Sequence, residues 1–393
     1  MAPNYYINHG IIKICIRFLN LFKWHYKRLN KYKIAKGEKV IILANHQTEF
    51  DTPLISLSFN KPVFAVVSDT FFSGKKRHIY KDFLGYIPHR KGMSDLKFPL
   101  MMAKALQREG AVLLFPEGNR SYAEFQYHIT EDFGRFIKAF KSTIILFNLK
   151  GGTGRNPRWG NGLRKGKFEG GITQVIKYDE YKDLSNEQLT KIILDGIKVF
   201  DSESNEEYIC PNRAEYLEEM LFACPKCHNV NTLHSHKEFI TCDKCGLNVE
   251  FTTTLKLKCD DPDFHFSTLN EWYQYQKKVI KDLKIKPGEV IFKDDNVKLV
   301  TMNPDEDTTL ISKGELSIDD KCLKVDNVSF DLKDIICASP FLGKNLQLSI
   351  LDKSYMILGE HRFNPLKYMF LLHKLDTAMK AKNVDKLFDI EDN

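Results

Sequence analysis

The feature that most constrains the fold is a set of short, almost wholly apolar runs in the first 150 positions. The runs are Val40 to Ala44, Val63 to Val67, Ala111 to Phe115 and Thr143 to Leu149. Between and after them, amphipathic patterns predict helices over Ser94 to Glu109 and Ile129 to Lys141. This order of strands and helices predicts an α/β domain with a central sheet. The reactive groups of such a domain lie where strands end in loops.

The segment before Glu38 is basic and contains no acidic residue. Its cations include Lys13, Arg17, Lys23, Lys27, Arg28, Lys31, Lys33 and Lys36. Apolar residues from Ile11 to Trp24 interleave with these cations, which favours a helix in the headgroup region of an anionic membrane, with Lys and Arg pointing outward. A helix packed on its own domain is the alternative.

No segment offers the run of about 18 or more apolar residues that a spanning helix requires. Lys13 and Arg17 also interrupt the apolar core that a cleaved signal would need. We therefore expect a peripheral protein on the cytoplasmic face of a membrane.

Four of the nine cysteines form two Cys-x-x-Cys pairs, Cys224 with Cys227 and Cys242 with Cys245. Fourteen residues separate the pairs, and this spacing predicts a zinc ribbon with a structural zinc ion. Redox-active pairs are the alternative. Four thiolates would leave no open position for catalysis. Because the surrounding charges are nearly balanced, we expect no nucleic acid as a partner.

The last hundred residues contain many short runs of alternating character, followed by one helical pattern. The runs are Glu289 to Phe292, Val297 to Met302, Gly314 to Ile318, Cys322 to Val325, Asn345 to Ile350 and Ser354 to Leu358, and the helix is about Asn364 to Ala378. They predict a small β-rich domain closed by a helix. Its pattern resembles that of a pleckstrin-homology domain.

A histidine and a carboxylate follow the first apolar run directly, at His46 and Asp51. Asp51 could accept a hydrogen bond from one imidazole nitrogen and leave the other as a general base for an alcohol. Residues five apart do not face each other on a helix, so His46 has to lie on a loop and Asp51 at a helix start. A surface or capping role is the alternative.

A second polar cluster follows the third run and contains Glu117, Gly118 and Arg120. Pro116 and Gly118 predict a turn that projects both charged side chains. A guanidinium there could bind a phosphate through two hydrogen bonds, and Glu117 could bind a hydroxyl. An ordinary turn with a surface ion pair is the alternative.

Three blocks together resemble the 1-acyl-glycerol-3-phosphate acyltransferases and their glycerolipid acyltransferase relatives. The blocks are Asn45-His46-Gln47 through Asp51, Gly85-Tyr86-Ile87-Pro88-His89-Arg90, and Phe115-Pro116-Glu117-Gly118-Asn119-Arg120-Ser121. The resemblance covers roughly residues 36 to 160. Asn119 stands where the family usually has threonine, which alters local hydrogen bonding but removes no charged group.

The resemblance implies His46 as the base, Asp51 as its orienting partner, and Arg90, Glu117 and Arg120 as acceptor-binding residues, with Gly118 as the turn residue. It implies transfer of a fatty acyl group from acyl-CoA or acyl carrier protein to the free hydroxyl of 1-acyl-glycerol-3-phosphate, a lysophosphatidate, forming phosphatidate in phospholipid synthesis. Three alternatives remain. They are acylation of another lysophospholipid or of glycerol-3-phosphate, a non-catalytic membrane adaptor, and a nucleic-acid-binding zinc protein.

The predicted organisation has six segments. They are a basic amphipathic membrane-binding segment (1–35), a glycerolipid acyltransferase-like α/β domain (36–212), the zinc ribbon (213–260), a helical linker (261–285), a pleckstrin-homology-like β domain (286–380) and a tail (381–393).

Overall fold

The computed structural model describes residues 4–90, 97–108, 110–124, 129, 132–360 and 362–375. The chain divides into two compact units. The first unit holds Met1–Arg90, Ser94–Pro157 and Leu163–Tyr208, and the second holds Lys91–Met93, Arg158–Gly162 and Ile209–Asn393. The predicted tail, both ends of the helix predicted over Ser94 to Glu109 and the end of the last predicted helix at Ala378 lie outside the described residues.

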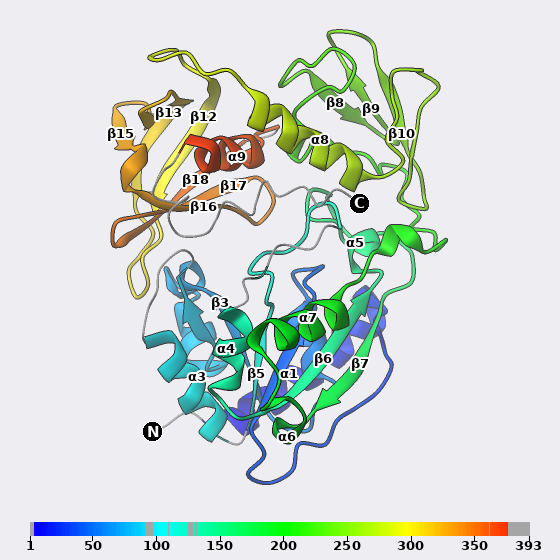
Figure 1. The fold of residues 1–393 in the computed structure, drawn as a ribbon, viewed down its shortest axis with the longest axis vertical. Helices are drawn as coiled ribbons and strands as arrows, with labels where there is room; N and C mark the ends of the chain where they lie inside the picture. Colours follow the sequence, from blue (N-terminus) through cyan, green and yellow to red (C-terminus); the bar gives the residue numbers. More distant parts are fainter. Residues whose placement is uncertain are drawn as a thin grey trace. The chain divides into compact units, whose positions relative to one another are not determined.

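A seven-stranded sheet forms the centre of the first unit, in the order β1-β7-β6-β2-β5-β3-β4. Its strands are β1 (Lys27–Arg28), β2 (Val40–Ala44), β3 (Val63–Ser68), β4 (Ile87–His89), β5 (Ala111–Leu114), β6 (Thr143–Lys150) and β7 (Glu169–Ile176). β6, β2, β5, β3 and β4 run parallel to one another, while β7 is antiparallel to β6. The α/β domain with a central sheet is thus confirmed (Figure 1).

Successive side chains of β2 point to opposite faces of the sheet, and both faces are covered. Val40, Ile42 and Ala44 pack in one apolar cluster with residues of the N-terminal helix, and Ile41 and Leu43 pack in another with residues of the later helices. The described helices of this unit are α1 (Tyr5–Leu19), η1 (Asn20–Trp24), α2 (Asp51–Ser56), η2 (Asp69–Phe72), η3 (Ile79–Phe83), α3 (Lys97–Gln107), α4 (Asp132–Lys138), α5 (Gly152–Arg155), α6 (Tyr178–Tyr181), α7 (Asn186–Ile197) and η4 (Asp201–Glu203). Burial on both faces explains why the strand sequences lack polar alternation.

The start of α7 shows how the sequence sets a helix boundary. The Ser185 hydroxyl accepts a hydrogen bond from the Gln188 backbone N–H, and the Gln188 side chain accepts one from the Ser185 N–H. This reciprocal cap satisfies two N–H groups that the helix leaves unpaired.

The second unit contains two antiparallel sheets. The smaller has the order β11-β10-β9-β8, and the larger has the order β15-β14-β13-β12-β18-β17-β16. Their strands are β8 (Leu233–His236), β9 (Phe239–Cys242), β10 (Asn248–Phe251), β11 (Leu257–Lys258), β12 (Phe292–Thr301), β13 (Leu310–Ile318), β14 (Cys322–Val325), β15 (Val328–Asp331), β16 (Ile335–Phe341), β17 (Asn345–Ile350) and β18 (Lys353–Leu358). A β-rich C-terminal region is therefore present.

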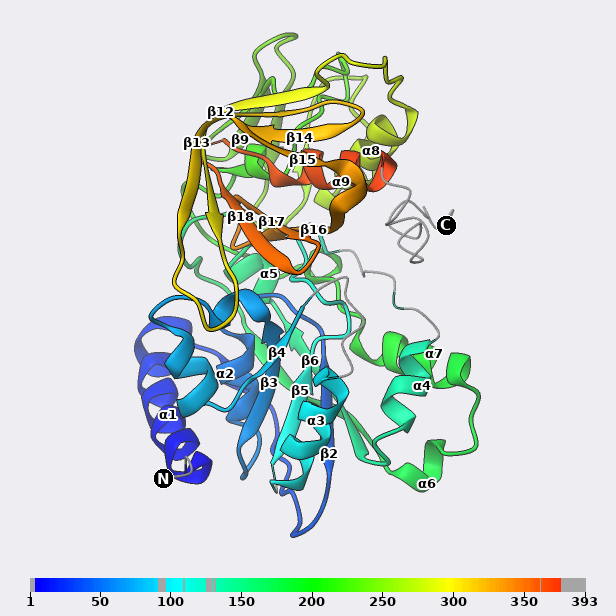
Figure 2. The ribbon, with the colours of Figure 1, turned by 90° about the vertical axis from the view of Figure 1, so that its left-hand side faces the viewer.

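Two helices complete this unit, α8 (Leu269–Asp282) and α9 (Pro365–Leu375) (Figures 1 and 2). The Trp272 indole of α8 donates a hydrogen bond to the Ala223 carbonyl at 2.9 Å, just before the first cysteine pair. All residues of α9 from Pro365 to His373 are buried. The strand expected over Glu289 to Phe292 is wrong, because β12 begins at Phe292 and Val290 is exposed.

Candidate active site

The loops that follow the parallel strands meet at one edge of the first sheet. His46 lies two residues after β2, Glu117 lies three residues after β5, and α5 follows β6. Because β2 pairs in parallel with both β5 and β6, these three loops leave the sheet at the same edge. This edge is the expected place for a reactive site in a sheet of this kind.

His46 and Asp51 form the predicted pair. His46 Nδ1 and Asp51 Oδ2 are 2.8 Å apart, and Asp51 is fully buried at the start of α2. Asp51 Oδ2 also accepts the backbone N–H groups of Gln47 at 2.7 Å and Thr48 at 2.9 Å. An ionised carboxylate only accepts hydrogen bonds, so this contact assigns the proton to Nδ1 and leaves Nε2 as the basic nitrogen.

The His46 ring is also held by an aromatic neighbour. It stacks on Phe115, the residue after β5, with ring centroids 4.0 Å apart and an interplanar angle of 15°. The imidazole is therefore fixed by a carboxylate at one nitrogen and by an aromatic face. Such fixation is what a general base requires.

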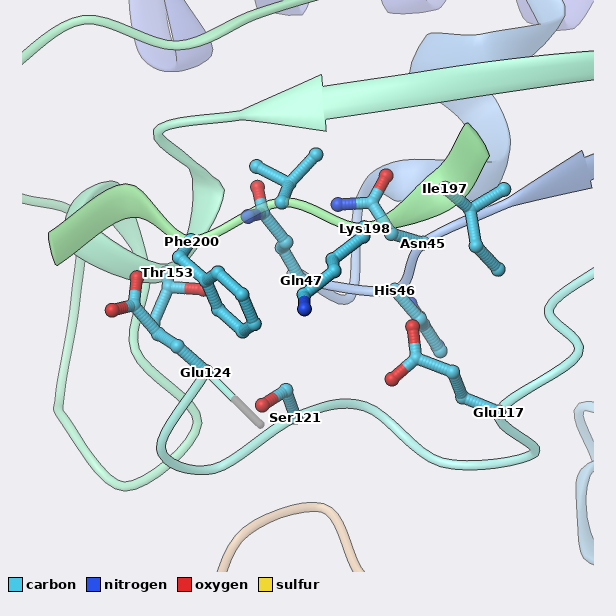
Figure 3. A pocket seen from close by; sticks show the side chains of 11 residues that line it. Asn45, His46, Gln47, Glu117, Ser121, Glu124, Thr153, Ile197, Lys198 and Phe200 are labelled. Carbon is cyan, nitrogen blue, oxygen red and sulfur yellow. The ribbon is translucent and has the colours of Figure 1, made fainter. Parts of the chain in front are cut away.

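A pocket of about 320 Å³, open to solvent, lies beside His46 (Figure 3). The described residues that line it are Asn45, His46, Gln47, Glu117, Ser121, Glu124, Thr153, Ile197, Lys198, Val199 and Phe200. The predicted residues His46 and Glu117 therefore meet at one cavity.

Gly118 forms the predicted turn after β5. Its φ is +64°, a left-handed conformation that side chains with a Cβ rarely adopt, and its N–H donates to the Phe115 carbonyl at 2.9 Å. Three residues later, the Ser121 N–H donates to the His46 carbonyl at 3.1 Å. The turn therefore brings Glu117 into the pocket and ties its loop to the histidine loop.

The two predicted arginines do not belong to the described lining of this pocket. Arg120 donates from Nε to the Gln47 carbonyl at 2.7 Å and from Nη2 to the Asn156 carbonyl, so it connects the histidine loop with the end of α5. Arg90 donates from Nε to Asp69 Oδ2 at 2.8 Å, and Asp69 is buried. Their role in binding an acceptor remains a prediction.

A buried hydrogen-bond network supports the histidine loop, and the sequence did not reveal it. Asp201 accepts the N–H groups of Gly151 at 2.6 Å and Thr153 at 3.0 Å, together with the Gln47 amide at 3.2 Å. The Gln47 amide oxygen in turn accepts the Gly152 N–H at 2.9 Å. Gln47 and Asp201 lie 154 residues apart, and no spacing motif could have paired them.

Glu124 belongs to the same network and also lines the pocket. Its carboxyl accepts the backbone N–H groups of Asp201 at 2.8 Å and Ser202 at 3.0 Å. Burial and the nearby Asp201 carboxylate raise the pKa of Glu124 to about 7, and these N–H donors oppose the shift. Burial and the Asp201 carboxylate thus favour the protonated form of this carboxyl group.

The N-terminal helix has one face on the domain and one exposed apolar face. His9 and Ile16 are buried, whereas Ile7, Ile11, Ile14, Phe18, Leu21 and Phe22 are each between 49% and 70% exposed. These six residues, the apolar stripe, recur at helical spacing on one side. Among the described residues no helix is long and apolar enough to cross a membrane.

Lys13 does not point outward as we expected. Its ammonium donates to the carbonyls of Phe59 and Lys61, each at 2.9 Å, and burial lowers its pKa to about 8. The cation instead satisfies carbonyls after α2, which explains why it interrupts the apolar run.

The four paired cysteines converge in the second unit. The Sγ atoms of Cys224, Cys227, Cys242 and Cys245 all lie within 4.8 Å of one another. Two of the Sγ separations, Cys224 to Cys245 and Cys227 to Cys242, are 3.7 Å. Four sulfurs bound to one zinc ion at about 2.3 Å would lie about 3.8 Å apart, so the cluster fits a tetrahedral metal.

The two cysteine turns have the same hydrogen-bond pattern. The N–H of His228 donates to the Cys224 carbonyl at 3.0 Å, and the N–H of Gly246 donates to the Cys242 carbonyl at 2.9 Å. His228 and Gly246 both have a positive φ. His228 therefore occupies the turn position that Gly246 fills in the other pair, and it serves the turn without belonging to the sulfur cluster.

Comparison with known proteins gives a family match within the first unit. Residues 26–150 match the family model described as Acyltransferase. This part of the chain is therefore similar to an acyltransferase domain. The match covers β1 to β6 and includes His46, Asp51, Glu117 and Arg120.

The solved structures that resemble part of the chain include the crystal structure of the 1-acyl-sn-glycerophosphate (LPA) acyltransferase PlsC from Thermotoga maritima. The likeness covers 48% of this chain and 78% of that chain, with 17% sequence identity and a TM-score of 0.38. No curated protein matches the sequence.

Proposed function

We propose that the chain is an O-acyltransferase that moves a fatty acyl group from acyl-CoA or acyl carrier protein to the free hydroxyl of 1-acyl-glycerol-3-phosphate. The product would be phosphatidate. The observation that carries this proposal is the His46–Asp51 pair, held at 2.8 Å beside a pocket that also contains Glu117. The acyltransferase domain of residues 26–150 supports the reaction class.

In the proposed reaction His46 Nε2 takes the proton of the acceptor hydroxyl while the hydroxyl oxygen bonds to the thioester carbonyl carbon. The C–S bond then breaks, and the leaving thiolate receives the proton from His46. Asp51 stabilises the imidazolium formed between these steps. The route needs no covalent acyl-enzyme. Glu117 is placed to bind a hydroxyl of the acceptor.

The test is acyl transfer from a labelled acyl thioester in vesicles that contain lysophosphatidate. Native protein should form labelled phosphatidate, and His46→Ala protein should not. Glycerol-3-phosphate and lysophospholipids with larger headgroups, tested in parallel, would show whether another acceptor is preferred. Native, folded protein that acylates none of these acceptors from either carrier would contradict the proposal and favour a membrane adaptor.

We propose that the cysteine cluster binds one structural zinc ion. The 3.7 Å sulfur separations and the matching turns support this assignment over a redox pair. A disulfide would require sulfurs about 2 Å apart. Metal analysis should find one zinc per chain in native protein and a clear loss in Cys242→Ser protein. Retention of zinc by that variant would contradict the assignment.

The strand order of the larger sheet and the closing helix α9 support the pleckstrin-homology-like prediction.

The apolar stripe supports a further part of the proposal, that the protein binds the cytoplasmic face of an anionic membrane. A helix surface with this much exposed apolar area, next to many cations, is suited to a headgroup region. Replacing Phe18 and Phe22 by serine should abolish flotation with phosphatidylserine vesicles. Leu351→Ser is the matched control, because Leu351 is 61% exposed but lies in the second unit. Equal flotation of both variants would contradict membrane binding by this helix.

A further inference from the structure

The segment that follows α7 places a lysine in the pocket. Lys198 is the residue after Ile197, the last residue of the helix, and its side chain extends toward the pocket between Gln47 and Phe200 (Figure 3). Among the described lining residues it is the single lysine or arginine. No local pattern in the sequence indicated this position, because one lysine at a helix end is common on any surface.

The backbone on either side of Lys198 is fixed. Ile197 is fully buried in the apolar core. On the other side, the Asp201 carboxylate accepts the bonds from Gly151, Thr153 and Gln47 described above, and Glu124 binds the N–H groups of Asp201 and Ser202. Lys198 therefore lies in a short segment that is held at Ile197 on one side and at Asp201 on the other. The same Asp201 network also holds the histidine loop.

The Lys198 ammonium lies 5.2 Å from the centre of the Phe200 ring. Within the described part of the chain it makes no hydrogen bond or ion pair. The arginines differ in this respect, since Arg120 is bound to backbone carbonyls and Arg90 to the Asp69 carboxylate. A cation that faces a pocket and leaves its hydrogen-bond donors for a ligand is suited to an anion.

Two carboxyl groups share the pocket lining with this cation, Glu117 and Glu124. The Glu124 carboxyl is engaged by two backbone N–H groups. A doubly charged phosphate offers an ammonium three strong acceptor oxygens, and lysine binds phosphate as a compact point charge.

We propose that Lys198 is the phosphate-binding residue of this pocket and that it makes the enzyme select a phosphorylated substrate. This inference rests on the proposed acyl transfer. The phosphate could belong to the lysophosphatidate acceptor or to the coenzyme A of the donor. Either way, Lys198 holds the anion while His46 acts on the hydroxyl.

The first experiment compares native protein with Lys198→Met and Lys198→Arg in steady-state acyl transfer. Loss of a charge-assisted bond should raise the KM for lysophosphatidate by about 10-fold to 100-fold, with a smaller change in kcat. Arginine should restore part of the affinity. Lys191→Met is the matched control, because Lys191 lies on α7 but is exposed and paired with Asp195 at 3.3 Å.

Two further substrates identify the source of the phosphate. If the acceptor supplies it, the substitution should leave the rate with neutral monoacylglycerol unchanged. If the donor supplies it, the KM for acyl-CoA should rise instead, and acyl-pantetheine, which lacks the nucleotide phosphates, should erase the difference. Unchanged KM values for both lysophosphatidate and acyl-CoA would overturn the proposal.

A binding measurement separates this inference from the reaction itself. The ³¹P resonances of glycerol 3-phosphate and of coenzyme A are recorded separately. At least one of them should broaden when native protein or the Lys191→Met control is added, and Lys198→Met should remove that broadening. Equal broadening by all three proteins, or no broadening of either ligand by native protein, would contradict phosphate binding at Lys198. If the broadening depends on Lys198 but native protein has no transferase activity, phosphate binding at Lys198 is supported and the proposed reaction is refuted. Thermal melting confirms that each variant is folded.

Discussion

The two units differ in what holds their interiors together. In the first unit, apolar strands buried on both faces align in parallel, and the polar groups gather at the loops of one edge. The second unit has a buried apolar interior as well, in which Leu299, Leu346 and Trp272 are fully buried. It also holds the buried Lys367 ammonium and a cysteine cluster with two buried members, Cys224 and Cys242. Both units thus rely on apolar packing, and the second adds a buried ion pair and a cysteine cluster to it.

Metal removal should give the largest difference between the units. The folding free energy of small zinc modules comes mostly from the metal, about 10–16 kcal/mol in zinc-finger peptides. A strong chelator should therefore make the chain around Cys224 to Cys245 sensitive to protease while the first unit stays resistant. Equal protection of both units after complete zinc removal would show that the ribbon does not depend on the metal.

The orienting carboxylate should have the next largest effect. Asp51→Asn keeps the shape of the side chain but removes the acceptor that assigns the Nδ1 proton of His46. In a comparable catalytic triad this change lowers kcat by about 10⁴-fold. We expect a loss of this order in acyl transfer, with a melting temperature near that of native protein. A kcat within tenfold of native would argue against Asp51 as the orienting group.

The buried cation of the second unit should rank third. Lys367 is fully buried, and its ammonium contacts Asp294 Oδ2 at 2.6 Å and Asn231 Oδ1 at 3.0 Å. Burial lowers the pKa of Lys367, and the Asp294 carboxylate opposes that shift. Asp294→Ala would leave the charge without its ion partner and should lower the unfolding free energy of the second unit by about 3–5 kcal/mol. Exposed Asp295→Ala is the control in denaturant titrations.

A surface contact of the first unit should have the smallest effect. Burial raises the pKa of Glu38, but hydrogen bonds from Lys177 and the Ala35 N–H outweigh it and lower this pKa to about 2. The ionised Glu38 carboxylate therefore stabilises the fold fully above about pH 4.5, and this stabilisation is lost as the pH falls toward 2. Because Lys177 is half exposed, Lys177→Met should cost about 0.2–1 kcal/mol at pH 7. The difference in unfolding free energy between native and Lys177→Met protein should disappear in thermal melts near pH 2. A difference that stays constant with pH would refute the Lys177–Glu38 contact as its cause.

The sequence predicted the elements whose residues carry their own pattern. β2 followed from its local residues, and the His46–Asp51 pair and the four cysteines followed from short spacings. β7 was missed because one of its faces is partly exposed and its Gly170-Gly171 lacks a strand pattern. Gln47–Asp201 and the pocket position of Lys198 depend on tertiary contacts, which no local spacing encodes.

In the proposed reaction, His46 removes a proton from the acceptor hydroxyl. The most direct measurement is the rate of thioester consumption by native and His46→Gln protein in the same lysophosphatidate vesicles. If His46 is the base, consumption should require the acceptor hydroxyl and should fall at least about 10²-fold in the variant, the lower range for a general base. A folded, zinc-loaded His46→Gln protein that consumes thioester at the native rate would contradict it.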